Sequence, residues 1–170
     1  MKYTFILLII LCLLMVFLMY YQNNDRISLA FSIEDGEIEE ITIKGINLVN
    51  DEIFRKQLFE FLHYDSKLDY KNKYYFLSKN YIGRYFPNVK TADHYVKEME
   101  YAEITERTNF EILNCILISE NNYQIDLSYD TENEGYLQRM TVRYFFVKEN
   151  GKWLYDGRDS SFIKWEDLQN

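Results

Sequence analysis

The strongest constraint on the fold is a pair of strand-like segments, near residues 122–131 and 137–148, that match each other residue by residue. If Glu134-Gly135 forms a two-residue turn, apolar residues face apolar residues on one side and acids face bases on the other. The predicted apolar pairs are Tyr129 with Met140, Leu127 with Val142, Ile125 with Tyr144, and Tyr123 with Phe146. The predicted charged pairs, on the face expected to meet solvent, are Asp126 with Arg143 and Asp130 with Arg139. A slip of one residue would destroy both patterns, so this register is predicted.

Two further turns extend this hairpin to four strands. Asn150-Gly151 suits a tight hairpin turn and predicts a strand near 152–158, with Tyr155 beside Phe146 on the inner face. An Asn121-Asn122 turn predicts a strand near 109–119. That strand would point Ile112, Ile116 and Ile118 inward and would set Asn114 opposite Tyr129. The inner face of the sheet is therefore predicted to be an aromatic wall that needs helices to cover it.

Helices are predicted before these strands. Helical spacing favours helices over about Asp51–Tyr64, with Asn50 as N-cap, over about Tyr70–Tyr85, and after Thr91. The segment 26–46, with Asp35-Gly36 at its turn, is predicted to be another hairpin. The predicted fold class is α+β: an N-terminal transmembrane helix, then helices packed on a curved antiparallel sheet.

The N-terminus predicts a membrane anchor. Residues 3–21 carry no charge, and at about 1.5 Å per residue they reach roughly 28 Å, close to the hydrocarbon thickness of a bilayer. We expect residues 1–24 to be an uncleaved anchor and residues 25–170 to be one domain outside the cytoplasm, in a single-pass protein of the cell membrane. Lys2 before the span favours that orientation. A cleaved signal peptide and a lipoprotein modified at Cys12 are the alternatives.

Charge and cysteine content exclude several classes of protein. The net charge is −8, so a phosphate backbone would be repelled, and no nucleic-acid partner is expected. Cys12 lies in the predicted anchor, which leaves Cys115 as the one cysteine of the domain and excludes a disulfide within it. Cys115 is expected to be a half-buried, inert thiol. No spacing suited to a metal or a cofactor occurs, so none is expected.

Two segments carry a family resemblance. They are "YFLSKNYIGRYFPNVKTADHYVKEMEYAE" and "YFFVKENGKWLYDG". The order of helices followed by a long antiparallel meander resembles the nuclear-transport-factor-2-like superfamily, also called cystatin-like, in its small membrane-anchored extracytoplasmic members. The resemblance implies a curved sheet and helices that enclose a cone-shaped pocket. It does not imply a reaction, because this fold hosts both enzymes and inert binding proteins.

The predicted pocket lacks a base. Enzymes of the resembled fold place an aspartate or a histidine inside it, whereas the inward strand positions predicted here hold no Asp, Glu or His. A helix could still supply one, from His63 with Asp65 and Asp69 or from Asp93 with His94. The candidate ligand-binding residues are Asn114, Tyr129, Tyr144 and Tyr155. The plainer interpretation is that Asn114 bonds Tyr129 or a main-chain group.

These observations favour a protein that binds rather than catalyses. We expect a non-catalytic, membrane-anchored binding or assembly protein of the cell envelope, of which a toxin-neutralising immunity protein is one variant. The alternative is a small-molecule-binding protein or an acid–base enzyme that uses the cone pocket. The predicted outer sheet face is less polar than an exposed face should be, which predicts a protein partner or a homodimer through the sheet. Its apolar residues are Leu113, Cys115, Leu117, Phe145, Val147 and Leu154.

Overall fold

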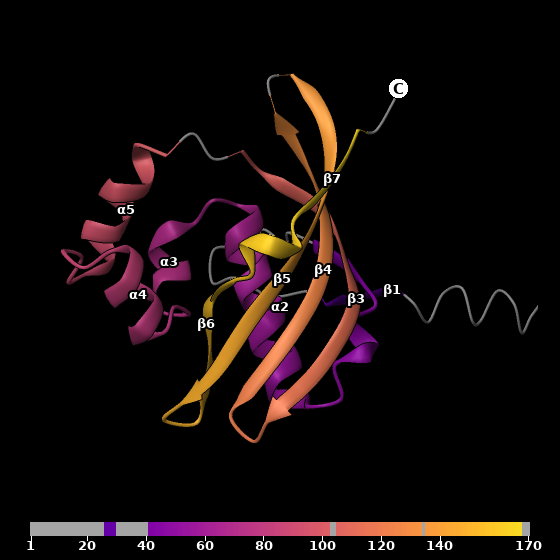
Figure 1. Cartoon of the computed structure of the whole chain (residues 1–170), viewed down its shortest axis with the longest axis horizontal. Helices are drawn as coiled ribbons and strands as arrows, with labels where there is room; N and C mark the ends of the chain where they lie inside the picture. The colour runs from indigo at the N-terminus through magenta and orange to yellow at the C-terminus, as the bar shows by residue number, and fades with distance from the viewer. Residues whose placement is uncertain (1–25, 30–40, 103–104, 134, 168–170) are drawn as a thin grey trace, which may run out of the picture.

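The structure is a computed structural model that describes residues 26–29, 41–102, 105–133 and 135–167. In these ranges seven strands form one sheet, in the order β1-β2-β3-β4-β5-β6, and β7 pairs with β5. Helix α2 lies along the concave side of the sheet, and α3, α4 and α5 gather beside β6 (Figure 1). The predicted class, α+β with helices packed against a mostly antiparallel sheet, is confirmed.

The central hairpin has the predicted register throughout. Strand β4 (Asn122–Asn133) pairs with β5 (Tyr136–Glu149) from Asn122 opposite Val147 to Asn133 opposite Tyr136. Both predicted ion pairs form, with Arg143 Nε 2.7 Å from Asp126 and Arg139 Nη1 2.9 Å from Asp130. The prediction that these carboxylates meet solvent is wrong, because both aspartates are buried.

An unpredicted C-terminal segment explains part of that burial. The 3-10 helix η2 (Ser160–Phe162) and strand β7 (Lys164–Asp167) return along β5. The Phe162 ring lies 3.9 Å from the guanidinium of Arg143, which holds Asp126. The face that carries the ion pairs is therefore partly covered.

Strand β6 (Lys152–Arg158) pairs with β5 in the predicted register from Lys152 as far as Tyr155. Asn150 and Gly151 both adopt positive φ, 52° and 80°, as a tight hairpin turn of this kind requires. Beyond Tyr155 the register shifts, so that Gly157 faces Phe145.

The predicted register of the first long strand is wrong. Strand β3 (Arg107–Ser119) reaches β4 through a turn at Glu120-Asn121, and its pairing shifts at three places. One shift lies between Ile112 and Asn114, where an extra residue reverses the faces that follow. As a result Asn114 pairs with Asp126 rather than with Tyr129. Cys115 and Leu117, predicted to point outward, share the inner face with Ile125 and Tyr123.

Helix α2 (Glu52–Ser66) covers the inner face as predicted, although its N-cap is Asp51 rather than Asn50. The Asp51 carboxylate accepts a hydrogen bond from the amide of Phe54 at 2.9 Å. The predicted stripe is fully buried and consists of Phe54, Leu58, Phe61 and Leu62. Helix α5 (Ala92–Glu100) begins after Thr91 as predicted, and its Tyr95 and Met99 are buried.

The single helix predicted over about Tyr70–Tyr85 is wrong. Two short helices, α3 (Tyr70–Tyr74) and α4 (Lys79–Tyr85), flank an extended piece of chain. That piece pairs with β6: the amide of Ser78 donates to the Tyr155 carbonyl at 2.9 Å, and the amide of Tyr155 donates to the Phe76 carbonyl at 2.7 Å. Hydrogen bonds to the main chain of β6 thus replace those that a continuous helix would make. Ser78 also caps α4.

The predicted N-terminal hairpin is confirmed at its two strands. Strand β1 (Arg26–Leu29) pairs antiparallel with β2 (Ile41–Lys44), while the predicted turn lies outside the described residues. Strand β2 meets β3 at one parallel pair, Lys44 opposite Glu111. In the described ranges no helix is long and apolar enough to cross a membrane. The predicted anchor, residues 1–24, falls outside those ranges.

Candidate functional site

The structure brings together three of the four predicted pocket residues. Tyr129, Tyr144 and Tyr155 are 1%, 3% and 7% exposed and lie on the inner face of the sheet. Asn114 is exposed on the opposite face beside Asp126. The extra residue in β3 separates Asn114 from the tyrosines, and the sequence carries no clear signal for that bulge.

The three tyrosines pack against other side chains. Tyr155 stacks on Phe61 with ring centroids 5.0 Å apart and meets Tyr144 edge to face, also at 5.0 Å. The Tyr129 hydroxyl lies 2.7 Å from the sulfur of Met140. Aromatic rings therefore pack against one another in the region where the family resemblance implied a cone-shaped pocket. Burial raises the pKa of Tyr144 and Tyr155 well above the ordinary tyrosine value, so neither is a base at neutral pH.

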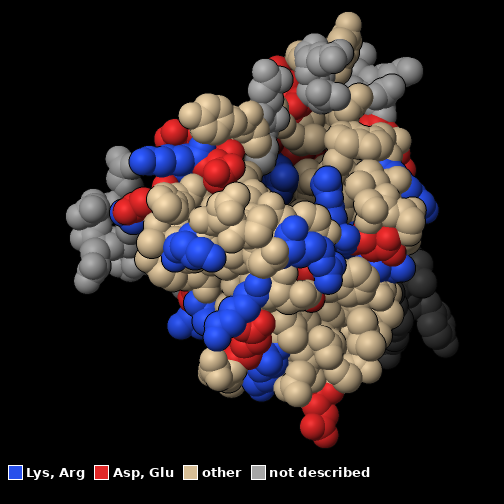
Figure 2. Space-filling view, turned by 60° about the vertical axis from the view of Figure 1, so that its left-hand side comes forward, with Lys and Arg blue, Asp and Glu red and all other residues tan. Residues whose placement is uncertain are grey.

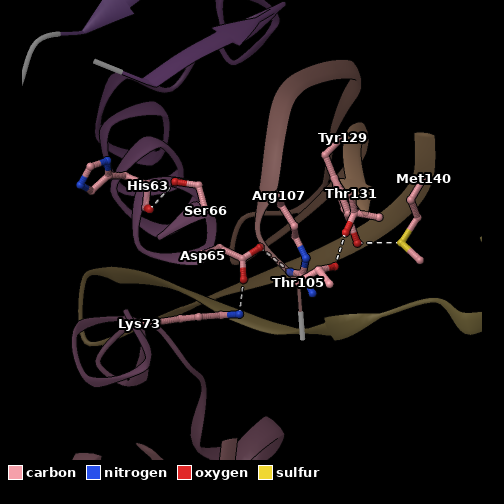
Figure 3. A network of polar contacts seen from close by, with 9 residues as sticks. All are labelled: His63, Asp65, Ser66, Lys73, Thr105, Arg107, Tyr129, Thr131 and Met140. Atoms are coloured by element: carbon pink, nitrogen blue, oxygen red, sulfur yellow. Dashed lines mark hydrogen bonds and ion pairs between the residues drawn. The ribbon is translucent and has the colours of Figure 1, made fainter. Parts of the chain in front are cut away.

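A buried ion triad lies next to this aromatic cluster. The Asp65 carboxylate, near the end of α2, accepts hydrogen bonds from Lys73 of α3 on one oxygen and from Arg107 of β3 on the other (Figure 3). The side chains of Asp65, Lys73 and Arg107 are 3%, 11% and 17% exposed. One carboxylate thus ties two helices to the sheet.

The triad holds two cations for one anion. Burial alone would raise the pKa of Asp65, but the adjacent Arg107 and Lys73 lower it below its ordinary value. The pKa of Lys73 is lowered, chiefly by burial. The contact with Asp65 raises it, but burial and the repulsion from Arg107 together outweigh that contact. Burial also opposes the charge of Arg107, yet the contact with Asp65 raises the Arg107 pKa well above its ordinary value. Asp65 and Arg107 are therefore the firmly charged pair, and Lys73 is the surplus cation.

The two helix-borne acid–base sets predicted from the sequence do not assemble. The ring of His63 points away from Asp65 (Figure 3). Asp69 caps α3, because its carboxylate accepts a hydrogen bond from the amide of Asn72. Asp93 forms an exposed ion pair with Lys71, at 3.3 Å, rather than a set with His94. Sequence reasoning missed the triad because Arg107 lies 42 residues after Asp65, and no spacing rule connects Asp65 with Lys73 or Arg107.

The triad is poorly suited to proton transfer. Both oxygens of Asp65 accept hydrogen bonds from cations, and its lowered pKa makes the carboxylate a weak base. Among the described residues, no group of three or more His, Cys, Asp or Glu side chains could hold a metal ion.

The second half of β3 forms an apolar edge of the sheet. Leu113, Ile116, Leu117 and Ile118 are 47%, 43%, 54% and 55% exposed. We call residues 113–119 the β3 edge. Cys115 lies within it, and burial, followed by the negative charge of Asp51, raises the pKa of its thiol to about 11. The thiol is therefore protonated at neutral pH, in keeping with the predicted inert cysteine.

A separate groove lies between the helices and the β5–β6 turn. It encloses about 410 Å³ and is lined by Tyr74, Tyr75, Leu77, Lys79, Ile82, Glu149, Asn150, Lys152 and Leu154. Basic side chains gather on this side of the molecule (Figure 2). The exposed basic residues of α3, α4 and the loop after α4 are Lys71, Lys79, Arg84 and Lys90. The overall charge of −8 conceals this local excess of positive charge.

Comparison with known proteins gives limited similarity. No family model matches the chain, and no curated protein matches it. Among solved structures, the chain is similar to the solution structure of RPA3114, a SEC-C motif containing protein from Rhodopseudomonas palustris. The two share 12% identical residues with a TM-score of 0.44, over 66% of this chain and 78% of that one.

Proposed function

We propose that this protein is a non-catalytic binding or assembly protein of the cell envelope, held to the membrane by residues 1–24, with its domain outside the cytoplasm. We also assign it to the cystatin-like superfamily, on the order of its helices and strands. Two observations support a binding role: packed aromatic rings occupy the interior, and an apolar sheet edge is exposed.

The β3 edge carries the proposal. Scattered exposed apolar residues are normal, but here Ile116, Leu117 and Ile118 follow one another along one strand. An exposed edge strand also offers main-chain hydrogen-bonding groups, and proteins ordinarily cover or charge such an edge. A protein partner that covers the β3 edge would satisfy both features.

The alternative, an acid–base enzyme, has one observation in its favour. Asp65 is a carboxylate buried inside the domain, as such an enzyme requires. To act as a base, however, Asp65 would first have to exchange Lys73 or Arg107 for substrate. The binding role needs no such rearrangement.

Site-specific cross-linking in native membranes tests the proposal. A photoreactive amino acid is placed at Ile118 of the full chain, and at Leu137, which is also exposed but lies on β5, as the matched control. We expect a defined cross-linked product from position 118 alone, in a membrane fraction that resists extraction by alkali. Equal products from both positions, no product from position 118, or release of the protein by alkali would contradict the proposal.

A further inference from the structure

Within the described ranges, the β3 edge lacks a neighbouring strand along one side. Strand β4 pairs with one side of β3, whereas β2 meets the other side only at Glu111. No strand among the described residues pairs with that side of residues 113–119. Because no described strand pairs there, an added strand could pair with the main chain of this side, a recurrent mode of peptide recognition.

A glycine ends the pairing of β2 with β3. Gly45 follows β2 directly and adopts φ 69°, which turns the chain into the 3-10 helix η1 (Ile46–Leu48). A Cβ atom at this position would lie 2.3 Å from the main-chain oxygen of Ile112. Only glycine permits this close approach, and the turn diverts the chain where the β3 edge begins.

The far end of the β3 edge is acidic. Glu120 is exposed directly after Ser119. Asp51, at the N-cap of α2, lies close enough to add to the rise that burial causes in the pKa of both Cys115 and Tyr123. A strand that carries a basic residue at this end would be attracted to it.

A second copy of this chain would not supply that basic residue from its own β3 edge. Residues 113–120 contain no lysine or arginine, so the β3 edge of a second copy would bring no cation of these residues to Glu120. The charge of Glu120 therefore favours a different partner.

We propose that the β3 edge binds, by strand addition, an extended apolar segment of another protein that carries lysine or arginine at the end next to Glu120. This inference rests on the proposed function and names the chemistry of the partner. Main-chain hydrogen bonds would supply general affinity, contacts with Ile116 and Leu117 would select apolar residues, and Glu120 would select the basic end.

Peptide binding to the full chain in detergent micelles tests the inference. The probe is a short fluorescent peptide of alternating valine and threonine with lysine at each end, and its twin carries glutamate at each end. We expect the lysine-ended peptide to bind at least about threefold more tightly, the scale of an exposed ion pair. Glu120→Lys should abolish or reverse that preference. Hydrogen exchange should show new protection of residues 113–119 when the peptide is bound.

Matched variants distinguish binding at the β3 edge from nonspecific binding of the peptide. Ile118→Lys should weaken binding about tenfold or more, because an edge lysine opposes strand addition, whereas Leu137→Lys on β5 should leave it within about twofold. Circular dichroism checks that both variants fold, and Ile118→Thr, a milder change, should weaken binding in the same direction.

Four outcomes would overturn the inference. The first two are equal affinity for the two peptides and no binding of either peptide at millimolar concentration. The others are protection outside residues 113–119 and self-association of the protein that Ile118→Lys removes. A partner cross-linked at Ile118 together with no peptide binding would reject strand addition but keep the proposed function. No cross-linked partner would reject the proposed function itself.

Discussion

Removal of the single anion of the triad should be far more damaging than removal of one of its cations. Asp65→Asn leaves Lys73 and Arg107 buried together without a counter-charge. Breaking a buried pair in this way typically costs about 3–5 kcal/mol of the free energy of unfolding. That is a large part of the roughly 5–15 kcal/mol expected for a whole domain.

Lys73→Met is the matched comparison. It removes the surplus cation, leaves Asp65 and Arg107 as a balanced pair, and keeps most of the apolar stem that lies near Phe61. Because burial already disfavours the charge of Lys73, we expect this change to cost less than about 1 kcal/mol. The double variant should be more stable than Asp65→Asn alone.

Urea unfolding of the full chain in detergent micelles measures these differences. With a slope of about 2 kcal/mol per molar urea, Asp65→Asn should lower the midpoint by about 1.5–2.5 M, and Lys73→Met by less than about 0.5 M. Equal shifts for the two variants would refute the assignment of Lys73 as the surplus charge. A shift below about 0.5 M for Asp65→Asn would refute the triad as a determinant of stability.

Four further predictions concern pH (two of them), the β2–β3 turn and the anchor. The folded-state pKa of Asp65 is lowered, so its contribution to stability is complete above the unfolded value of 3.8 and is lost as pH falls through the folded pKa; Asp65→Asn should remove that loss in acid unfolding curves. The Lys73 pKa is also lowered, so stability should rise as pH increases from the folded pKa of Lys73 towards 10.5, and Lys73→Met should flatten this rise. Gly45→Ala should lower stability by at least about 1 kcal/mol more than Gly135→Ala, because both have positive φ but only the first clashes with main chain; equal melting temperatures would contradict this. Mass spectrometry of the membrane-extracted protein should find residues 3–21 retained, and an N-terminus near residue 23 or a lipid on Cys12 would show processing instead.

The sequence predicts the fold best where two independent patterns agree. The β4–β5 register followed from apolar pairs on one face and ion pairs on the other, so each pattern checked the other. The Asn150-Gly151 turn was equally secure, because the dipeptide itself favours the positive φ angles observed. On β3 only an apolar run was available, and such a run fits several registers, so the bulge after Ile112 went unpredicted.

The candidate sites depend on contacts that no local pattern reveals. The segment Tyr70–Tyr85 shows helical periodicity, yet the helix is interrupted before Ser78 because the edge of β6 takes the main chain instead. Asp65 finds Arg107 only after the helices have packed on the sheet. Tertiary contacts therefore decide where a helix is interrupted and which charges pair, and the periodicity of the sequence does not determine either.

The paired segment at Ser78 also limits how molecules of this kind can aggregate. A filament built by strand addition needs two exposed edges, so that the β3 edge of one molecule can meet an edge such as β6 of the next. The main-chain groups of Phe76 and Ser78 already occupy β6 at Tyr155. Head-to-tail growth through β6 is blocked at that point, and a strand bound at β3 could not extend the sheet of the next molecule through this part of β6.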